Sequence, residues 1–375
     1  MTEYSPSGRY LAVDFYRGLT IALMIIVNTA GDWAHIYPPL RHAEWHGCTP
    51  TDLVFPSFMF IIGVSMWFAF ARYERKWSAE LGWKILRRTV ILFVIGLLLN
   101  KYPWYWKDFE SWRIMGVPQR LALGYGIGSV LALTLSRKTL IWVSAGILLL
   151  YWYLLWQFPL MGGDPYALHT NAVRVLDRML FGDSHLYHGD GIAFDPEGVL
   201  STLPAIVTVL LGWLSGELLG SRAAQKDLLV RDLLLFGLIC GFTGLAWDLF
   251  FPINKKLWTS SYVLYAGGIS MVLLAASVWV IDVRGWRNGT GFFLAFGANA
   301  LFAYVFSEAF IMTLSAIRWT GADGEETSVA RWIYDTIFRP IEGAEFSSFL
   351  FAFVYMLVCW LLCRWLYVRK IYIKI

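Results

Sequence analysis

The first apolar segment of the chain contains side chains that are unusual inside an apolar helix. The stretch VDFYRGLTIALMIIVNTAGDW holds Asp14 and Arg17, which are three residues apart and share a helix face, and Asn28 near its end. Eleven residues from Arg17 to Asn28 return to within about 20° of the same face and cover roughly 16 Å along the axis. Two interpretations stay open: a salt bridge with an interhelical asparagine hydrogen bond, or a polar stripe that binds a ligand.

A second polar group precedes the next apolar segment, in LRHAEWHGCTPTDLVFP at residues 40–56. His42 and His46 carry imidazoles, which exchange a proton near neutral pH and suit general base catalysis. A histidine in a loop is also a common surface residue, so its chemistry alone does not decide between catalysis and simple exposure. Thr51 or Asp52 is expected to cap the helix that begins here.

The segment FDPEGVLSTLPA also allows two interpretations. Asp195 is placed as a helix N-cap, Pro196 as the first helical residue and Glu197 in the first turn, where acidic groups complement the helix dipole. The same two carboxylates, Asp195 and Glu197, would suit a site for a cationic amine.

Further cations and amides lie at the ends of other apolar segments. Together they would supply cations and amides to one side of a helix bundle, although each could be a lone structural residue. They are Arg113, Gln119 and Arg120 before and within the fourth segment, Asn254, Lys255, Lys256 and Trp258 before the eighth, and Asn299 and Glu308 in the ninth. No His-x-x-x-His pair occurs, and the four cysteines show no metal-ligand spacing, so we predict neither a metal site nor a disulfide framework.

These residues sit in a chain with the composition of a membrane protein. Of its 375 residues 58% are hydrophobic and 15% are charged, whereas soluble domains carry about 25% charged residues. A spanning helix needs about 20 apolar residues, and we predict an all-α polytopic domain over residues 1–375 with about ten such helices. They cover 11–31, 52–72, 85–101, 118–136, 139–158, 199–220, 232–251, 260–281, 292–315 and 346–367.

Lysine and arginine are more frequent in every second loop, beginning with the N-terminal segment. Basic loops lie on the cytoplasmic side of a membrane. This pattern and the even number of spans predict that both termini are cytoplasmic. Residues 40–51, 102–117, 159–198, 252–259 and 316–345 would then face outward, together with all six histidines. The small net charge of +4 is spread between apolar segments, which favours membrane orientation over nucleic-acid binding.

The ordered motifs resemble one known family. VDFYRGLTIALMIIVN, HAEWHGCTPTDLVFP, RIMGVPQRLALGY, FDPEGVLSTLPAI, NKKLWTSSYVLYAGG and GANALFAYVFSE follow one another as in the heparan-α-glucosaminide N-acetyltransferase family. The resemblance runs from about residue 9 to the C-terminus. It is strongest to the shorter bacterial members, and it implies that the N-terminal luminal domain of the animal enzyme is lacking.

The resemblance implies a transmembrane acyltransferase that moves an acetyl group from cytosolic acetyl-CoA to the amine of a glucosamine-type sugar. It further implies a homodimer in a bacterial inner membrane with an active site facing the periplasm. His42 matches the catalytic histidine of the H-A-x-W-x-G motif and Asn28 matches the active-site asparagine. His46 falls on a variable position of the motif and ranks second.

The resemblance and the polar stripe together predict where the two substrates bind. The phosphates of CoA are expected near Arg17 and Asp14, with Arg9, although Arg113, Gln119, Arg120 and Lys255 are an alternative set. The amino sugar is expected at Trp45, Asp195, Glu197 and Trp258.

His42 would act as general base while Asn28 donates a hydrogen bond to the oxyanion, or His42 would itself be acetylated first. A secondary transporter for a sugar or amino-sugar conjugate is the alternative function, and a membrane scaffold is a further one that leaves the polar stripe unexplained.

Overall fold

A computed structural model describes residues 10–105, 109–159, 162–320 and 324–373. Most of the described chain is helical. The helices are α1 (Leu11–Asn28), α2 (Val54–Ala69), α3 (Ala79–Lys101), α4 (Val117–Thr134), α5 (Arg137–Gln157), α6 (Ala172–Phe181), α7 (Val199–Ser221), α8 (Lys226–Asp248), α9 (Ser260–Val278), α10 (Thr290–Ala298), α11 (Ala300–Ala316), α12 (Val329–Ile333) and α13 (Ala344–Val368). Short 3-10 turns are η1 (Pro38–Leu40), η2 (Pro50–Leu53), η3 (Ala71–Tyr73), η4 (Phe109–Ser111) and η6 (Asp183–His185), and π-helical turns are η7 (Trp279–Val283) and η8 (Tyr334–Phe338).

Seven helical segments of the described chain are long and apolar enough to cross a membrane. They are α1, η2 with α2, α5, α7, α8, α9 with η7, and α13, and a bent pair formed by α10 and α11 would be an eighth. This set is typical of an integral membrane protein. Helices also cover the third and fourth predicted spans, but α3 carries Lys84, Arg87 and Arg88, and α4 carries Gln119 and Arg120. The predicted count of ten therefore stays a prediction.

The ninth predicted span, 292–315, is not one straight helix. It is divided at Asn299 into α10 and α11, which meet at an angle of 82°. The side chain of Asn299 is hydrogen-bonded to the C-terminal segment. Its amide nitrogen donates to the Ile371 carbonyl at 3.0 Å, and its oxygen accepts from the Ile373 amide at 2.8 Å. Gly297 packs against α1 so closely that an added Cβ would lie 2.2 Å from the Asp14 carbonyl oxygen. These contacts stabilise the break.

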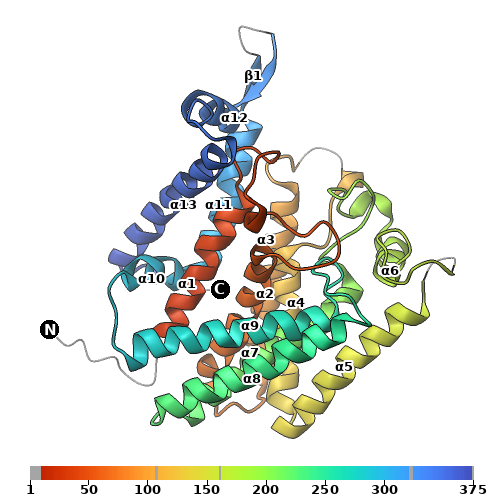
Figure 1. Cartoon of the computed structure of the whole chain (residues 1–375), viewed down its shortest axis with the longest axis vertical. Coiled ribbons are helices and arrows are strands. Elements are labelled where there is room, and N and C mark those ends of the chain that lie inside the picture. The colour runs from red at the N-terminus through yellow and green to blue at the C-terminus, as the bar shows by residue number, and fades with distance from the viewer. Residues whose placement is uncertain (1–9, 106–108, 160–161, 321–323, 374–375) are drawn as a thin grey trace.

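The helices pack by close backbone approach at small residues, as membrane bundles do. α2 crosses α7 at Gly63, where an added Cβ would lie 1.9 Å from the carbonyl oxygen of Val209. α8 and α9 run side by side along one flank of the molecule, and α1 lies between this pair and α13 (Figure 1). The central helices α1, α2 and α7 therefore form the buried part of the bundle, with more than half of each buried.

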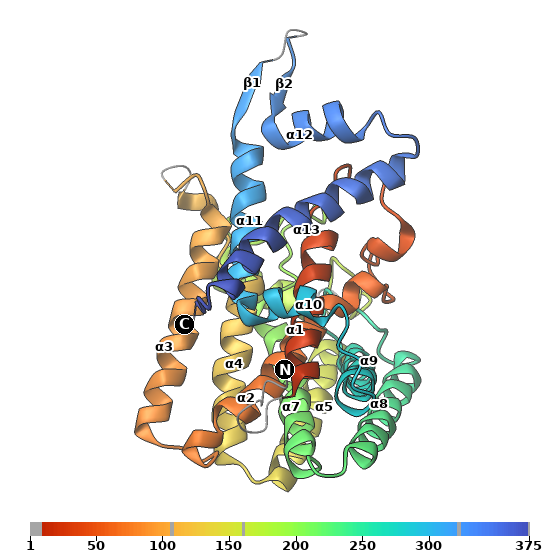
Figure 2. The same cartoon turned by 90° about the vertical axis from the view of Figure 1, so that its left-hand side faces the viewer.

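The segments between helices gather where the polar motifs lie. The Ile114 amide donates to the His185 carbonyl, and the Gly47 amide donates to the Ile253 carbonyl at 2.7 Å. Loops 29–49, 102–116, 182–198 and 249–259, which are far apart in sequence, thus meet at one end of the bundle. Beyond α11 the chain forms a hairpin of β1 (Arg318–Thr320) and β2 (Glu326–Ser328), which projects away from the helices (Figure 2).

Candidate active site

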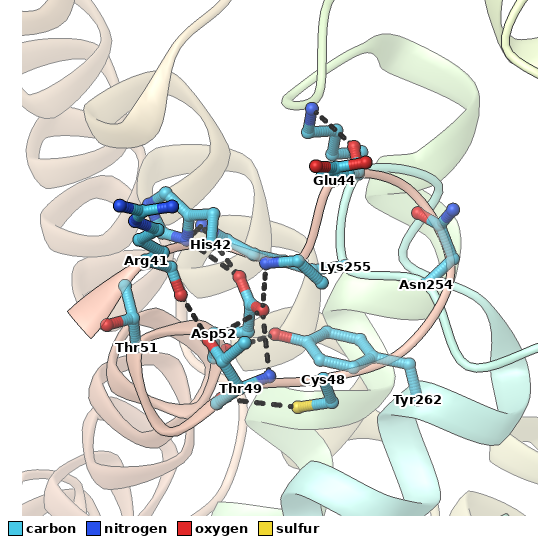
Figure 3. A network of polar contacts seen from close by, with 12 residues as sticks. Arg41, His42, Glu44, Cys48, Thr49, Thr51, Asp52, Asn254, Lys255 and Tyr262 are labelled. Atoms are coloured by element: carbon cyan, nitrogen blue, oxygen red, sulfur yellow. Dashed lines mark hydrogen bonds and ion pairs between the residues drawn. The ribbon is translucent and has the colours of Figure 1, made fainter. Parts of the chain in front are cut away.

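His42 lies in the loop before α2 with its imidazole held by a buried carboxylate. Its Nδ1 is 2.7 Å from Oδ1 of Asp52. The Asp52 side chain is 1% exposed whereas that of His42 is 41% exposed. The carboxylate therefore lies in the protein wall and the imidazole faces outward from it (Figure 3). Because a carboxylate only accepts hydrogen bonds, it places the imidazole proton on Nδ1 and leaves Nε2 as a free base.

Asp52 also caps the helix that follows the loop. Thr49 is the N-cap of η2, and Asp52 at the fourth position completes a capping box. Oδ2 of Asp52 accepts from the amides of Thr49 and Ala43, each at 3.0 Å. Asp52 was one of two expected caps, and it serves as the partner of the Thr49 cap. The other, Thr51, does not cap, since its hydroxyl donates to the Pro39 carbonyl. One carboxylate thus fixes both the start of α2 and the orientation of His42.

A lysine from a distant loop completes this group. Nζ of Lys255 is 3.3 Å from His42 Nδ1 and 3.9 Å from Asp52 Oδ1. Burial lowers the pKa of Lys255, and the charge of Asp52 partly offsets that effect. The hydroxyl of Tyr262 in α9 donates to the Asp52 carbonyl at 2.6 Å. Cys48 lies beside the group, but burial raises its pKa to about 12, which keeps the thiol neutral and a poor nucleophile near neutral pH.

The two other aromatic or imidazole side chains of this motif have different surroundings. His46 is exposed, and its Nδ1 is 3.4 Å from the Asn254 amide nitrogen, with no carboxylate bonded to it among the described residues. The indole of Trp45 donates to the Tyr166 carbonyl at 2.8 Å, and its ring packs edge-on against Phe194. His46 therefore lacks the orienting carboxylate that His42 has. The ring of Trp45 packs beside the ring of His46.

Arg113 joins the two carboxylates of the FDPEG segment. Its guanidinium donates two bonds to Asp195, at 2.8 and 2.9 Å, and one to Glu197 at 2.7 Å. Burial alone would raise the pKa of Glu197, but the charges of Arg113, Arg120 and Lys255 lower it. Asp195 and Glu197 are thus already paired with a cation, and Glu197 connects this ion network to Lys255.

The expected capping role of Asp195 is wrong. The N-cap of α7 is Gly198, and the side chain of Asp195 instead accepts from the Glu197 amide and from Arg113. The first amide of α7, that of Val199, is capped by Oδ1 of Asp177 at 2.9 Å. The bidentate bond to Arg113 holds the Asp195 carboxylate away from the helix end.

Three of the predicted substrate contacts are buried in the protein. They are Arg120 and Gln119, expected to bind CoA, and Trp258, expected to bind the amino sugar. Arg120 is fully buried, donates to the Gly198 carbonyl and to Ser201, and lies 4.9 Å above the ring of Trp258. Trp258 is 1% exposed, so its ring is not accessible to a sugar in this conformation. Gln119 is also fully buried, and its amide donates to the Ile114 carbonyl at 2.9 Å.

The polar stripe of α1 is divided between two places. Arg17 donates to Asp14 at 2.6 Å, to the Gly297 carbonyl at 2.8 Å and to Ser65 at 3.3 Å. Its guanidinium thus binds the end of α10, and it is partly exposed. Asn28, at the other end of α1, donates to Glu308 of α11 at 3.1 Å. Arg9 lies outside the described residues.

Asn28 and His42 are not hydrogen-bonded to each other in the described chain. Asn28 is the last residue of α1, and His42 lies in the loop that follows this helix. The two side chains are bonded to different carboxylates, Asn28 to Glu308 and His42 to Asp52.

Sequence reasoning predicts His42 and Asn28 as catalytic candidates but does not predict the carboxylates that bond them, Asp52 and Glu308. Asp52 was recognised only as a helix cap, although the TPTD motif gave its spacing from His42. Glu308 was noted only as a polar residue of the ninth segment. A buried carboxylate ten residues after a loop histidine is the signal that would have suggested an orienting pair.

The arrangement of His42 and Asp52 suits proton transfer. A histidine whose Nδ1–H is bonded to a buried carboxylate presents Nε2 as a general base in one fixed tautomer and stabilises the imidazolium that forms. The same carboxylate would fix the ring for nucleophilic attack by Nε2. Within the described residues no group of three or more His, Cys, Asp or Glu side chains could hold a metal ion.

Comparison with known proteins identifies relatives that share these motifs. A family model, heparan-alpha-glucosaminide N-acetyltransferase, catalytic, matches residues 9–177, which include Asn28, His42, Asp52 and Arg113. The heparan-alpha-glucosaminide N-acetyltransferase of Homo sapiens is 32% identical over 365 residues, covering 80% of this chain and 53% of the human protein. The mouse (Mus musculus) protein of the same name is 31% identical over 379 residues, covering 86% and 56%.

The chain spans about half the length of these curated relatives. The match extends well past the region of the family model, because it covers at least 80% of the chain. The resemblance seen in the motifs is confirmed, and the chain is a relative of the heparan-α-glucosaminide N-acetyltransferases.

Proposed function

We propose that the protein is a transmembrane acetyltransferase in which His42, oriented by Asp52, is the catalytic base. The observation that carries the proposal is the 2.7 Å contact between a half-exposed imidazole and a buried carboxylate in the matched motif. The donor is acetyl-CoA from the cytoplasm, and the acceptor is the amine of a glucosamine-type sugar on the other side of the membrane. The relationship to named N-acetyltransferases supports this reaction class.

The chemical step needs only proton transfer and carbonyl polarisation. The amine nitrogen of the acceptor attacks the thioester carbonyl carbon, so a C–N bond forms and the C–S bond breaks. Nε2 of His42 removes the proton from the attacking nitrogen and returns a proton to the departing thiolate sulfur. A two-step path, in which Nε2 first accepts the acetyl group and then passes it to the amine, uses the same residues.

Asn28 is the proposed donor to the oxyanion that develops on the thioester oxygen. A preorganised amide donor of this kind contributes about 3–4 kcal/mol in other enzymes. Asn28 lies at the end of α1, where the loop that carries His42 begins, and it is half-buried. Loop 29–49 would bring the two catalytic side chains together around the bound thioester.

The nucleotide of CoA carries phosphates that require cations. Arg17 has its donors directed to Asp14, Gly297 and Ser65, so a phosphate there would compete with existing bonds. Lys255 lies beside the catalytic pair with its side chain 18% exposed, so it is placed to contact the thioester end of acetyl-CoA and not the phosphates, which lie at the far end of the pantetheine arm. Arg120 is fully buried, and its guanidinium lies over the ring of Trp258. It therefore supports the site from inside the protein.

Sidedness and assembly complete the proposal. Ten spans, with α3 and α4 included, return both termini to the cytoplasm and place the His42 loop outside, at the periplasmic face of a bacterial inner membrane. The meeting of loops 29–49, 102–116, 182–198 and 249–259 at one end of the bundle supports this arrangement, because all four are predicted on the same side. The protein is proposed to act as a homodimer.

A transporter for an amino sugar is the rival function, and the bent α10–α11 pair favours it, since broken helices line many transport sites. The experiment reconstitutes the protein in liposomes with acetyl-CoA inside and glucosamine outside. It measures free thiol inside and N-acetylglucosamine outside. The proposal predicts that both rise together and only in the presence of acceptor. Uptake of glucosamine without thiol release would show a transporter and contradict the proposal.

A further inference from the structure

Glu308 is a carboxylate in the apolar helix α11, within the sequence ALFAYVFSEAF. An ionisable group at membrane depth is costly and marks a functional position by default. The hydrogen bond found for Glu308 comes from the amide nitrogen of Asn28, at 3.1 Å. Both side chains are half-buried.

The chemistry of the two groups fixes the Asn28 amide in one orientation. A carboxylate offers only acceptors, whereas a primary amide has two N–H donors at one end and an oxygen at the other. The Asn28 oxygen would be repelled by Glu308, so the NH₂ end must face it. One N–H is then bonded to Glu308, and the second N–H projects from the same nitrogen in a fixed direction.

We propose that Glu308 is a positioning residue for the acetyl transfer, one that holds Asn28 with its second N–H directed at the thioester oxygen. The inference rests on the proposed function. Without Glu308 the Asn28 side chain would no longer be held in one rotamer, and only a small share of its orientations would direct an N–H at the thioester oxygen.

A double-mutant cycle tests this role. The steady-state constants of the purified protein are measured for Asn28→Ala, Glu308→Ala and the double variant, with acetyl-CoA and glucosamine. Glu308→Ala is expected to lower kcat about 10- to 100-fold with KM for acetyl-CoA little changed, because a misplaced group costs this much. In the Asn28→Ala background the Glu308→Ala change should have almost no further effect. Equal losses in both backgrounds would overturn the proposal.

A paired exchange separates positioning from simple helix–helix attachment. In the variant Asn28→Asp with Glu308→Gln, the hydrogen bond between α1 and α11 is kept with donor and acceptor reversed. The proposal predicts a melting temperature near that of the wild type and activity as low as that of Asn28→Ala, because no N–H is left for the oxyanion. Recovery of activity together with stability would show a merely structural role and refute it.

The controls distinguish this inference from the function on which it rests. Glu308→Gln alone keeps an acceptor oxygen for Asn28 but adds a competing donor, so its activity should fall between those of the wild type and of Glu308→Ala. If Asn28→Ala is fully active, the role of Asn28 in the proposed function fails. If Asn28→Ala is impaired while Glu308→Ala is not, the positioning role alone fails.

Discussion

The exchange Asp52→Asn tests the catalytic pair with the smallest change in shape. Asparagine is isosteric with aspartate, and its oxygen can still accept from the amides of Ala43 and Thr49, which now bond Oδ2 of Asp52 at 3.0 Å. Its NH₂ group would then face Nδ1 of His42. Because an amide nitrogen only donates, Nδ1 must become the acceptor and the imidazole proton moves to Nε2. The variant therefore removes the base from the position that faces the substrate.

The expected magnitude follows from the contact that is lost. A hydrogen bond to a charged group stabilises by about 1.5–3 kcal/mol, and each 1.36 kcal/mol is tenfold in rate, so the lower bound is a decrease in kcat of about 10- to 150-fold. If the general base is lost as well, the decrease in kcat would reach about 10²–10⁴-fold. Stability should fall by no more than about 3 kcal/mol, the contribution of the bond to His42, because the asparagine oxygen keeps the two amide bonds of the capping box.

The assay is thiol release from acetyl-CoA with glucosamine as acceptor, with the melting temperature of each purified variant measured alongside. Asp32→Asn is a matched control, because Asp32 also bonds a histidine, His35, at 3.0 Å, but this pair is more exposed than that of His42 and has no proposed role in the reaction. The control should keep its rate within about twofold, as surface substitutions usually do. A folded Asp52→Asn variant whose kcat is within threefold of the wild type would refute the orienting role of Asp52.

Three other substitutions test the fold around the site. Burial raises the pKa of Asp177 to about 7, well above its unfolded value of about 3.9. Between these two pH values the carboxyl is protonated in the folded state but ionised in the unfolded state. The free energy of unfolding therefore falls as the pH rises from about 4 to about 7. Asp177→Asn should flatten the dependence of melting temperature on pH between about 4 and 7, and an unchanged slope would contradict the assignment. Arg113→Gln leaves two buried carboxylates unpaired and should cost about 3–5 kcal/mol, seen as a large loss of melting temperature that Arg113→Lys partly recovers; wild-type stability would refute it. Gly63→Ala should prevent the close crossing of α2 and α7 and reduce the folded yield, whereas Gly146→Ala, with open space around it, should be tolerated; equal yields would show that the crossing adapts.

The helices and their approximate positions were predictable, because apolar segments of spanning length are a direct signal of the bilayer. The broken ninth segment was not. Asn299 looked like a lone polar residue in a continuous apolar run, and its role became visible only with the C-terminal segment folded back onto it. Local hydropathy contains no information about such a long-range partner.

The candidate site shows the same division between local and distant information. The motif around His42 predicts the loop in which the structure shows an imidazole bonded to a buried carboxylate, since chemistry and capping signals are both local. The pairing of Arg113 with Asp195 joins residues 82 positions apart, and the bond of Asn28 to Glu308 joins residues 280 apart. The local sequence around Asp195 allows a helix cap. In the structure its carboxylate instead pairs with the distant Arg113.

The most direct measurement of the central claim compares His42→Ala with His46→Ala. Both residues lie in the same loop, and only His42 has a buried carboxylate on its ring. Initial rates of acetyl transfer from acetyl-CoA to glucosamine are measured for the two purified variants and the wild type. We predict that His42→Ala lowers the rate at least about 10²-fold, as expected for loss of a general base, while His46→Ala stays within about threefold. Full activity of His42→Ala, or an equal loss in both variants, would contradict the account.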